Sequence, residues 1–219
     1  MKNTISKSPP SFWQGHLYHM LSLSFLIIII TISWTVSGQN SPLEFWSAVS
    51  VVVVHQFYVW VWWRRKLNNM KALPFGIYHS GFMILFLSRF ISLFLLSDST
   101  RGTLHLPTTA VYILSVLLFT PSFFAMYSVV RYFGLKRATG ADHYFEKYRM
   151  IPHENRGIFR FTSNGMYVYA FLMFWGIALS LNSLEGLIVA AFSHAYIWVH
   201  FILLEKPDMN YLYGTNTNQ

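Results

Sequence analysis

Six long apolar segments constrain the fold of this chain more than any other feature of its sequence. They lie near residues 17–36, 43–63, 77–97, 107–133, 165–182 and 186–204. A helix needs roughly 20 apolar residues to cross the hydrocarbon core of a bilayer, and most of these segments reach that length. Because 54% of the residues are hydrophobic and 11% are charged, a water-soluble globule would leave large apolar patches exposed. The sequence therefore predicts an all-α, polytopic membrane helix bundle with about six transmembrane helices.

The placement of the basic residues predicts the orientation of the bundle. The formal net charge is +8. Basic clusters follow the second segment, at residues 64–66, and fill the connection between the fourth and fifth segments. The opposite end carries Arg101 as its one basic residue. This asymmetry fits the positive-inside rule, so we expect both termini to be cytoplasmic and no nucleic-acid partner.

The chain is expected to form one domain. Residues 17–214 make up a single transmembrane domain, with a polar N-terminal tail at 1–16 and a short tail at 215–219. The first apolar segment is long for a signal peptide, so we favour a retained helix. The absence of cysteine leaves the compartment undecided. A bacterial inner membrane or the endoplasmic reticulum would suit such a protein, and self-association is left open.

The last apolar segment closes with Glu205-Lys206-Pro207, an unusual ending for a membrane helix. Proline has no backbone N–H, so the helix is expected to end there. A carboxylate at this depth needs a cationic partner, either a neighbouring side chain or a small charged ligand. With a rise of about 1.5 Å per residue, Asn164 and Glu205 lie at the same depth on either side of a turn near Ser183. The sequence thus predicts a polar site between helices at the cytoplasmic end.

Short motifs around this site carry a family resemblance. The stretch Phe161-Thr-Ser-Asn-Gly-Met-Tyr167, followed by a hairpin, Glu205-Lys206-Pro207 and Tyr213-Gly214, resembles the phospholipid N-methyltransferases of the phosphatidylethanolamine type. These enzymes belong to the integral-membrane superfamily that includes isoprenylcysteine carboxyl methyltransferase. Residues 122–134 also resemble the end of the preceding helix in that family. The resemblance covers about residues 110–214.

The resemblance implies a methyltransferase of the EC 2.1.1 class that uses S-adenosylmethionine. Its expected acceptor is a phospholipid amine headgroup, such as that of phosphatidylethanolamine, and its partners are the lipid substrate and the bilayer. The residues expected at the cofactor site are Asn164, Gly165, Tyr167, His200, Glu205 and Lys206. The chain departs from the family pattern at Gly165, where proline is usual. It departs again at residues 113–115, where the family often has Gly-x-Gly, which we expect to serve helix packing.

The connection over residues 134–163 supplies the expected catalytic and substrate-binding groups. An acceptor amine must lose a proton before methyl transfer, so a general base is needed. His153, His143 and Glu154 are the candidates, and a solvated side chain is the alternative for each. Arg156 and Arg160 are candidates for holding a lipid phosphate, with membrane topology as the alternative explanation. The connection itself is either a lid over the site or an interfacial anchor.

Other functions remain open at this stage. The chain could methylate a prenylcysteine carboxylate or a small thiol, reduce a sterol with NADPH, or be a haem-binding or structural membrane protein. His55, His194 and His200 form no HxxH or HxxxH pair, so no metal site is predicted. Arg89 lies within the third apolar segment, where a charge is costly, and is expected to face a polar cavity or to snorkel. Its depth offers no acidic partner.

Overall fold

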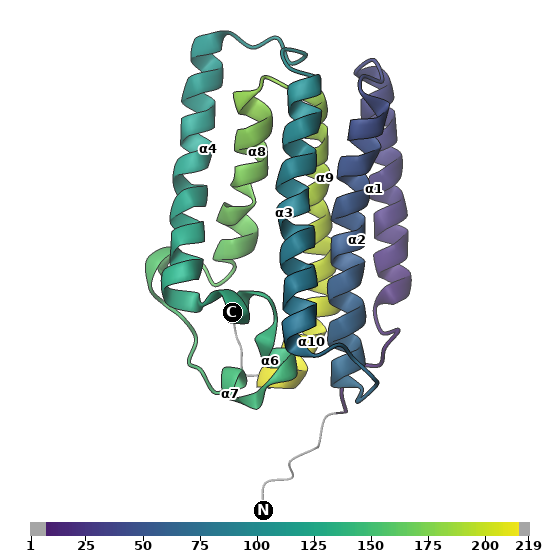
Figure 1. Cartoon of the computed structure of the whole chain (residues 1–219), viewed down its shortest axis with the longest axis vertical. Coiled ribbons are helices and arrows are strands. Elements are labelled where there is room, and N and C mark those ends of the chain that lie inside the picture. The colour runs from purple at the N-terminus through teal and green to yellow at the C-terminus, as the bar shows by residue number, and fades with distance from the viewer. Residues whose placement is uncertain (1–7, 215–219) are drawn as a thin grey trace, which may run out of the picture.

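The regular elements of the protein are helices, as predicted. The structure, a computed structural model, describes residues 8–214 and shows no strand in that range (Figure 1). The predicted tail at 215–219 and residues 1–7 of the N-terminal tail lie outside the described residues. Five helices are long and apolar enough to cross a membrane. They are α1 (His16–Val36), α2 (Pro42–Leu67), α3 (Phe75–Ser99), α4 with its continuation (Thr108–Phe133), and the helix through α9 and α10 (Leu184–Tyr213).

The fifth apolar segment forms a shorter helix than the predicted span at 165–182. It forms a π-helical turn, Met166–Ala170, followed by α8, Leu172–Ser180. Fifteen or so helical residues extend roughly 22 Å, which falls short of the hydrocarbon thickness of about 30 Å. The multi-pass bundle therefore consists of five long helices and one short helix.

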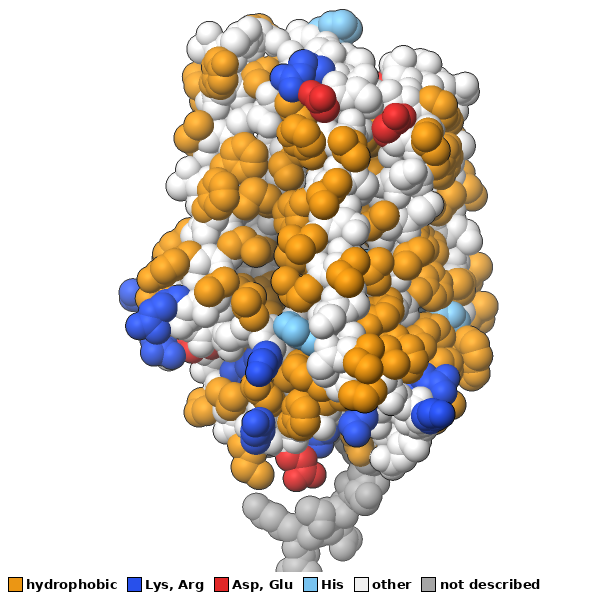
Figure 2. Space-filling model, in the orientation of Figure 1, with side chains coloured by type: hydrophobic (Ala, Val, Ile, Leu, Met, Phe, Trp, Pro, Cys, Tyr) orange, Lys and Arg blue, Asp and Glu red, His pale blue; other side chains and the backbone are white. Residues whose placement is uncertain are grey.

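Helix α9, Leu184–His200, lies at the centre of the bundle and packs against α1, α2, α3 and α8. The main core joins Phe45 of α2, Leu93 of α3, Phe174 of α8 and Tyr196 of α9. The outer faces carry many exposed apolar side chains, and on the face that Figure 2 shows they appear as orange atoms over much of the bundle. Such a surface suits a lipid environment and would be a liability in water.

Helix α4, Thr108–Ser128, stands at one side of the bundle. It packs along α8 and the π-helical turn that precedes it. Within residues 8–214, α4 makes no extensive contact with α3. Figure 1 shows α8 lying between these two helices. This arrangement leaves an apolar cavity between α3 and α4, described below.

The expectation that Pro207 ends the last helix is wrong. After α9 the chain makes a π-helical turn, Phe201–Glu205, and continues as α10, Lys206–Tyr213. Pro207 lies in the first turn of α10, where its missing N–H costs no hydrogen bond. Two further π-helical turns, Val129–Phe133 and Met166–Ala170, lie at this same end of the bundle. Such turns add one residue per turn and are frequent at functional sites.

The connection between α4 and α8 folds under this end as short helices. They are α5 (Leu135–Ala138), α6 (Ala141–Tyr144), α7 (Glu146–Arg149) and a 3-10 turn (Gly157–Arg160). The described part of the N-terminal segment is tied to α2, since Asn68 donates to the Pro10 carbonyl at 3.0 Å. Most of the basic side chains gather here, as the blue atoms in Figure 2 show. We call this the basic end.

Candidate functional site

A polar cavity of about 450 Å³ opens at the basic end. The π-helical turns form part of its wall through Phe133, Tyr167 and Glu205, and the connection forms another part. Its polar lining consists of Arg137, Asp142, His153, Ser163, Asn164, Tyr167, Glu205, Lys206, Asn210 and Tyr213. The volume lies within the range of small-molecule sites in proteins, roughly 300–1,000 Å³. The cavity thus combines carboxylates, amides and cations within one concave surface.

Glu205 and Tyr167 form a hydrogen-bonded pair in the wall of this cavity. The Tyr167 hydroxyl lies 2.6 Å from both Oε1 and Oε2 of Glu205, and it donates to the carboxylate. The ring of Tyr167 packs against Phe201 at 4.9 Å between centroids. Each residue of the pair belongs to a π-helical turn on a different helix. The predicted convergence of Tyr167 and Glu205 is present.

The predicted cofactor residues fall into three groups. Asn164, Tyr167, Glu205 and Lys206 line the polar cavity together. His200 instead lines a second, apolar cavity and is fully buried. Gly165 lines neither cavity, because it packs under Ile158. A Cβ at this position would lie 2.9 Å from the Ile158 side chain, so the space filled by proline in the family is occupied here.

The apolar cavity, of about 150 Å³, lies on the other side of the Glu205–Tyr167 pair. Both residues line both cavities, so the pair forms a partition between them. The apolar cavity is walled mainly by aromatic side chains of α3 and α8 and by Met126 and Val129 at the end of α4. Residues 113–115, where the family's Gly-x-Gly is missing, line neither cavity. Trp63, Ala138 and Met166 also line both cavities, so the polar and the apolar cavity share this wall.

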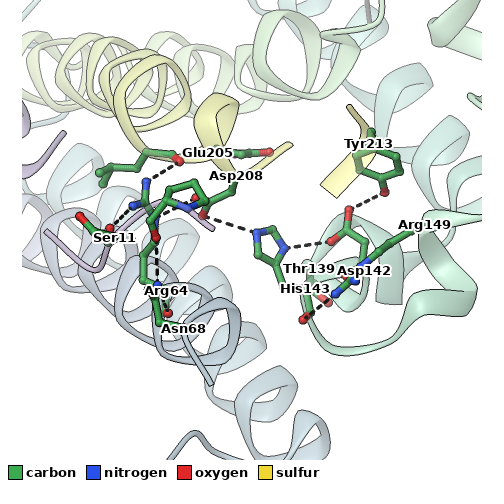
Figure 3. A network of polar contacts seen from close by, with 12 residues as sticks. Ser11, Arg64, Asn68, Thr139, Asp142, His143, Arg149, Glu205, Asp208 and Tyr213 are labelled. Carbon is green, nitrogen blue, oxygen red and sulfur yellow. Dashed lines mark hydrogen bonds and ion pairs between the residues drawn. The ribbon is translucent and has the colours of Figure 1, made fainter. Parts of the chain in front are cut away.

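A buried network of charges holds the polar cavity in shape (Figure 3). Arg64 of α2 pairs with Asp208 of α10 at 2.8 Å, and its guanidinium also donates to the carbonyls of Ser11 and Leu204. Asp208 faces His143 at 3.6 Å, and His143 contacts Asp142 at 3.0 Å. The network joins α2, α6 and α10, three helices that are far apart in the sequence.

The network continues from Asp142 into the cavity wall. Tyr213 donates to its second carboxylate oxygen at 2.7 Å, and both residues line the polar cavity. Burial alone would lower the pKa of His143, but the carboxylates of Asp142 and Asp208 outweigh it and raise the pKa to about 9. Burial opposes ionisation of Asp142, yet the His143 partner and other hydrogen bonds hold its pKa below the usual value. His143 therefore carries a positive charge at neutral pH.

The three candidate bases have different surroundings. His143 already holds a proton at neutral pH and lines neither cavity. Glu154 is bound by Arg156, whose hydrogen bonds lower the carboxyl pKa to about 2, and such a weak base accepts a proton poorly. His153 lies at the rim of the polar cavity and is exposed. Of the three, His153 alone lines the candidate site.

The predicted phosphate-binding arginines lie outside both cavities. Arg156 pairs with Glu154 at 2.8 Å and lies over the ring of Tyr132, 5.1 Å from its centroid. Arg160 is exposed at the end of the 3-10 turn. The structure places a different arginine at the site: Arg137 lines the polar cavity and donates to the carbonyls of residues 151 and 152.

Sequence reasoning missed part of the cavity wall. Arg137 is one of many basic residues in the connection, and Asp142 lies in the first turn of α6, a helix of four residues. Asn210 lies beyond the proline at which the helix was expected to end. Tyr213 belongs to the motif that carried the family resemblance, and that motif was the available signal.

Comparison with known proteins gives a match to one family model. No curated protein and no solved structure matches the chain. The sequence model of the family described as phospholipid methyltransferase matches residues 110–216. That range begins near the start of α4 and includes Asn164, Tyr167, Glu205 and Tyr213. Over residues 110–216, the chain is thus similar to the phospholipid methyltransferase family.

Proposed function

We propose that the protein uses S-adenosylmethionine to N-methylate a phospholipid amine headgroup, such as that of phosphatidylethanolamine. The observation that carries this proposal is the Glu205–Tyr167 partition between a polar cavity and an apolar one. A water-soluble donor and a lipid acceptor can approach this partition from opposite sides. With the basic end on the cytoplasmic side, as the positive-inside rule favours, the polar cavity opens to the cytoplasm.

The side chains of the polar cavity fit the groups of this cofactor. Glu205 and Asp142 offer carboxylates to its ammonium group and its sulfonium charge. Arg137 and Lys206 offer cations to its carboxylate. Asn164, and Asn210 of α10, offer amide donors and acceptors to its ribose hydroxyls and base. When bound, S-adenosylmethionine supplies an electrophilic methyl group on sulfur.

The protein's own contribution is positioning and exclusion of water. Glu205 and Tyr167 hold each other in a fixed geometry at the point where the two cavities meet. The apolar cavity gives an acceptor amine a dry approach from the membrane side. His153, at the rim of the polar cavity, is the side chain we propose to take the proton from the acceptor. The role of His143 is to position Asp142.

The direct test is methyl transfer from radiolabelled S-adenosylmethionine to phosphatidylethanolamine by the purified protein in lipid nanodiscs. We expect labelled lipid from the wild type, and a loss of at least tenfold in kcat/KM for Glu205→Gln, since a charge-assisted contact is removed. Glu146→Gln is the matched control, because Glu146 is exposed and lines neither cavity. If the wild type labels a prenylcysteine or a thiol and no phospholipid, the lipid assignment fails.

A further inference from the structure

Arg89 is a buried cation that the proposed methyl transfer does not use. It lies in α3 and is 3% exposed, and it lines the apolar cavity. Its guanidinium lies over the rings of Phe171 and Phe174, at 5.1 and 5.0 Å from their centroids. Through Nη2 it donates to Ser193 of α9, while Nε has no partner. Within residues 8–214, no carboxylate pairs with Arg89.

Two further buried polar side chains line the same cavity. His55 and Gln56 of α2 are 2% and 3% exposed, and both line the apolar cavity. Both ring nitrogens of His55 are buried without a hydrogen-bond partner in the described part of the chain. Gln56 makes no side-chain hydrogen bond there either. An aromatic cavity is thus lined by three polar groups whose hydrogen-bonding capacity is largely unused, which is costly unless a ligand supplies partners.

The cavity is placed to receive its ligand from the bilayer. Met83 of α3 and Met126 of α4 line it and are partly exposed. These two helices make no extensive contact in residues 8–214, so the side of the cavity between them faces the membrane. A lipid can enter here with its chains still in the bilayer, whereas a water-soluble anion has no such route.

The spacing of the polar groups selects one part of a lipid. Arg89 is bound to Ser193, which is twelve residues before Glu205 on the same helix, a backbone rise of at most about 18 Å because the last five residues are π-helical. In an extended ethanolamine phospholipid, nine bonds separate the amine nitrogen from the ester carbonyl carbon, or about 11 Å. Adding a hydrogen bond of about 2.8 Å at each end approaches this backbone rise between the two groups. The phosphate, four bonds from the amine, would fall well short.

We infer that Arg89, with Gln56 and His55, binds the ester carbonyl oxygens of the acceptor lipid while its amine lies at the Glu205–Tyr167 partition. This inference rests on the proposed function and names the lipid class: diacyl phospholipids with ester-linked chains. Guanidinium and amide N–H groups are donors, and an ester carbonyl is an acceptor without N–H or O–H groups of its own. Ether-linked phospholipids have the same headgroup and lack this acceptor.

The test compares KM for ester-linked and ether-linked phosphatidylethanolamine with the purified protein in nanodiscs. We expect the wild type to show a KM about tenfold lower for the ester lipid. Arg89→Met should raise the KM for the ester lipid about tenfold and leave the ether lipid unchanged, so that the discrimination disappears. Arg101→Met is the matched control, since Arg101 is exposed at the opposite end of the bundle and pairs with Asp98.

Two further arms keep the test decisive. Arg89→Lys and Gln56→Leu should reduce the discrimination even if Arg89→Met does not fold, and S-adenosylmethionine binding checks that each variant is intact. Equal KM values for both lipids in the wild type, or an equal rise for both in the variants, would overturn the inference and point to the phosphate or to a structural lipid. If the wild type methylates neither lipid, the proposed function fails instead. Native mass spectrometry of bound ester and ether lipids then decides the role of Arg89 alone.

Discussion

At the residue scale, the site depends on a carboxylate held by one hydroxyl. Glu205 has Tyr167 as its hydrogen-bond partner, and both oxygens of the carboxylate lie 2.6 Å from the same hydroxyl. One O–H group cannot satisfy two carboxylate oxygens that each accept several hydrogen bonds. Glu205 therefore has unused acceptor capacity toward the polar cavity, as a residue that binds a cationic ligand requires.

Tyr167→Phe should weaken S-adenosylmethionine binding about tenfold. The change removes the donor that orients Glu205, and a hydrogen bond to a charged group contributes about 1.5–3 kcal/mol. Isothermal titration calorimetry of the detergent-purified protein measures the effect. Tyr127→Phe is the control, because Tyr127 is exposed on α4 and lines neither cavity. An unchanged Kd for Tyr167→Phe would show that Tyr167 does not position the carboxylate.

His143 should make stability depend on alkaline pH. Its pKa is raised to about 9 in the folded protein, against about 6.5 when unfolded. The stabilisation is therefore complete below pH about 6.5 and is lost as the pH rises through about 9, with a size on the order of 3 kcal/mol. Thermal unfolding between pH 6.5 and 9.5 should show a steeper fall in Tm for the wild type than for His143→Gln. Parallel curves would contradict the assigned charge state.

At the element scale, the short helices of the connection are fitted closely to α2. Gly140 has φ of +86°, and a Cβ there would collide with the ring of Trp63. Trp63 also stacks on His143 with 4.1 Å between ring centroids. This contact sets how near α6, and with it Asp142, comes to the end of α2. The connection is therefore part of the cavity wall, and its own helices are too short to be stable alone.

Gly140→Ala should destabilise the protein more than a change of backbone preference explains. Any alanine at positive φ costs roughly 1–2 kcal/mol, and the clash with Trp63 adds about 1–3 kcal/mol. Gly102→Ala isolates the first effect, because Gly102 has φ of +85° and no atom within 4 Å of a Cβ placed there. Thermal unfolding compares the two variants. The same Tm for both would mean that α6 moves away from Trp63 at little cost.

The sequence predicted long helices better than it predicted their ends. Apolar length alone placed the main spans, because the bilayer requires it. The sequence gives no sign of the π-helical turns. Each turn has five residues, and one extra residue per turn leaves the apolar pattern almost unchanged over that length. The prediction for Pro207 was wrong because the proline lies in the first turn of a new helix, where its N–H is not needed. Asn164, Tyr167 and Glu205 were found by motif and depth, whereas Arg137 and Asn210 needed the folded chain.

At the scale of the whole molecule, the charge network connects α2, α6 and α10 at the basic end, outside the main hydrophobic core. Arg64 and Asp208 are buried, and their pair joins α2 to α10 beyond the central packing of α9. A buried pair of this kind is weak support for stability in general, but removal of one partner leaves the other charge unpaired. We therefore expect the network to specify how the basic end assembles around the polar cavity.

Arg64→Met should lower stability by about 3–5 kcal/mol, because Asp208 and the carbonyls of Ser11 and Leu204 lose their partner. The double variant Arg64→Met with Asp208→Leu should recover part of this loss, since no unpaired carboxylate remains. Chemical unfolding in detergent gives both values. If the loss of stability in the double variant equals the sum of the losses in the two single variants, Arg64 and Asp208 do not stabilise the protein through their contact with each other.

The measurement that bears most directly on the central claim is S-adenosylmethionine binding to the purified wild type and to Glu205→Gln by isothermal titration calorimetry. The partition between the cavities predicts saturable binding at one site for the wild type. It predicts binding at least tenfold weaker for Glu205→Gln, with Glu146→Gln unchanged. Absence of binding to a folded wild-type protein, or equal binding to Glu205→Gln, would contradict the assignment of the polar cavity as the cofactor site.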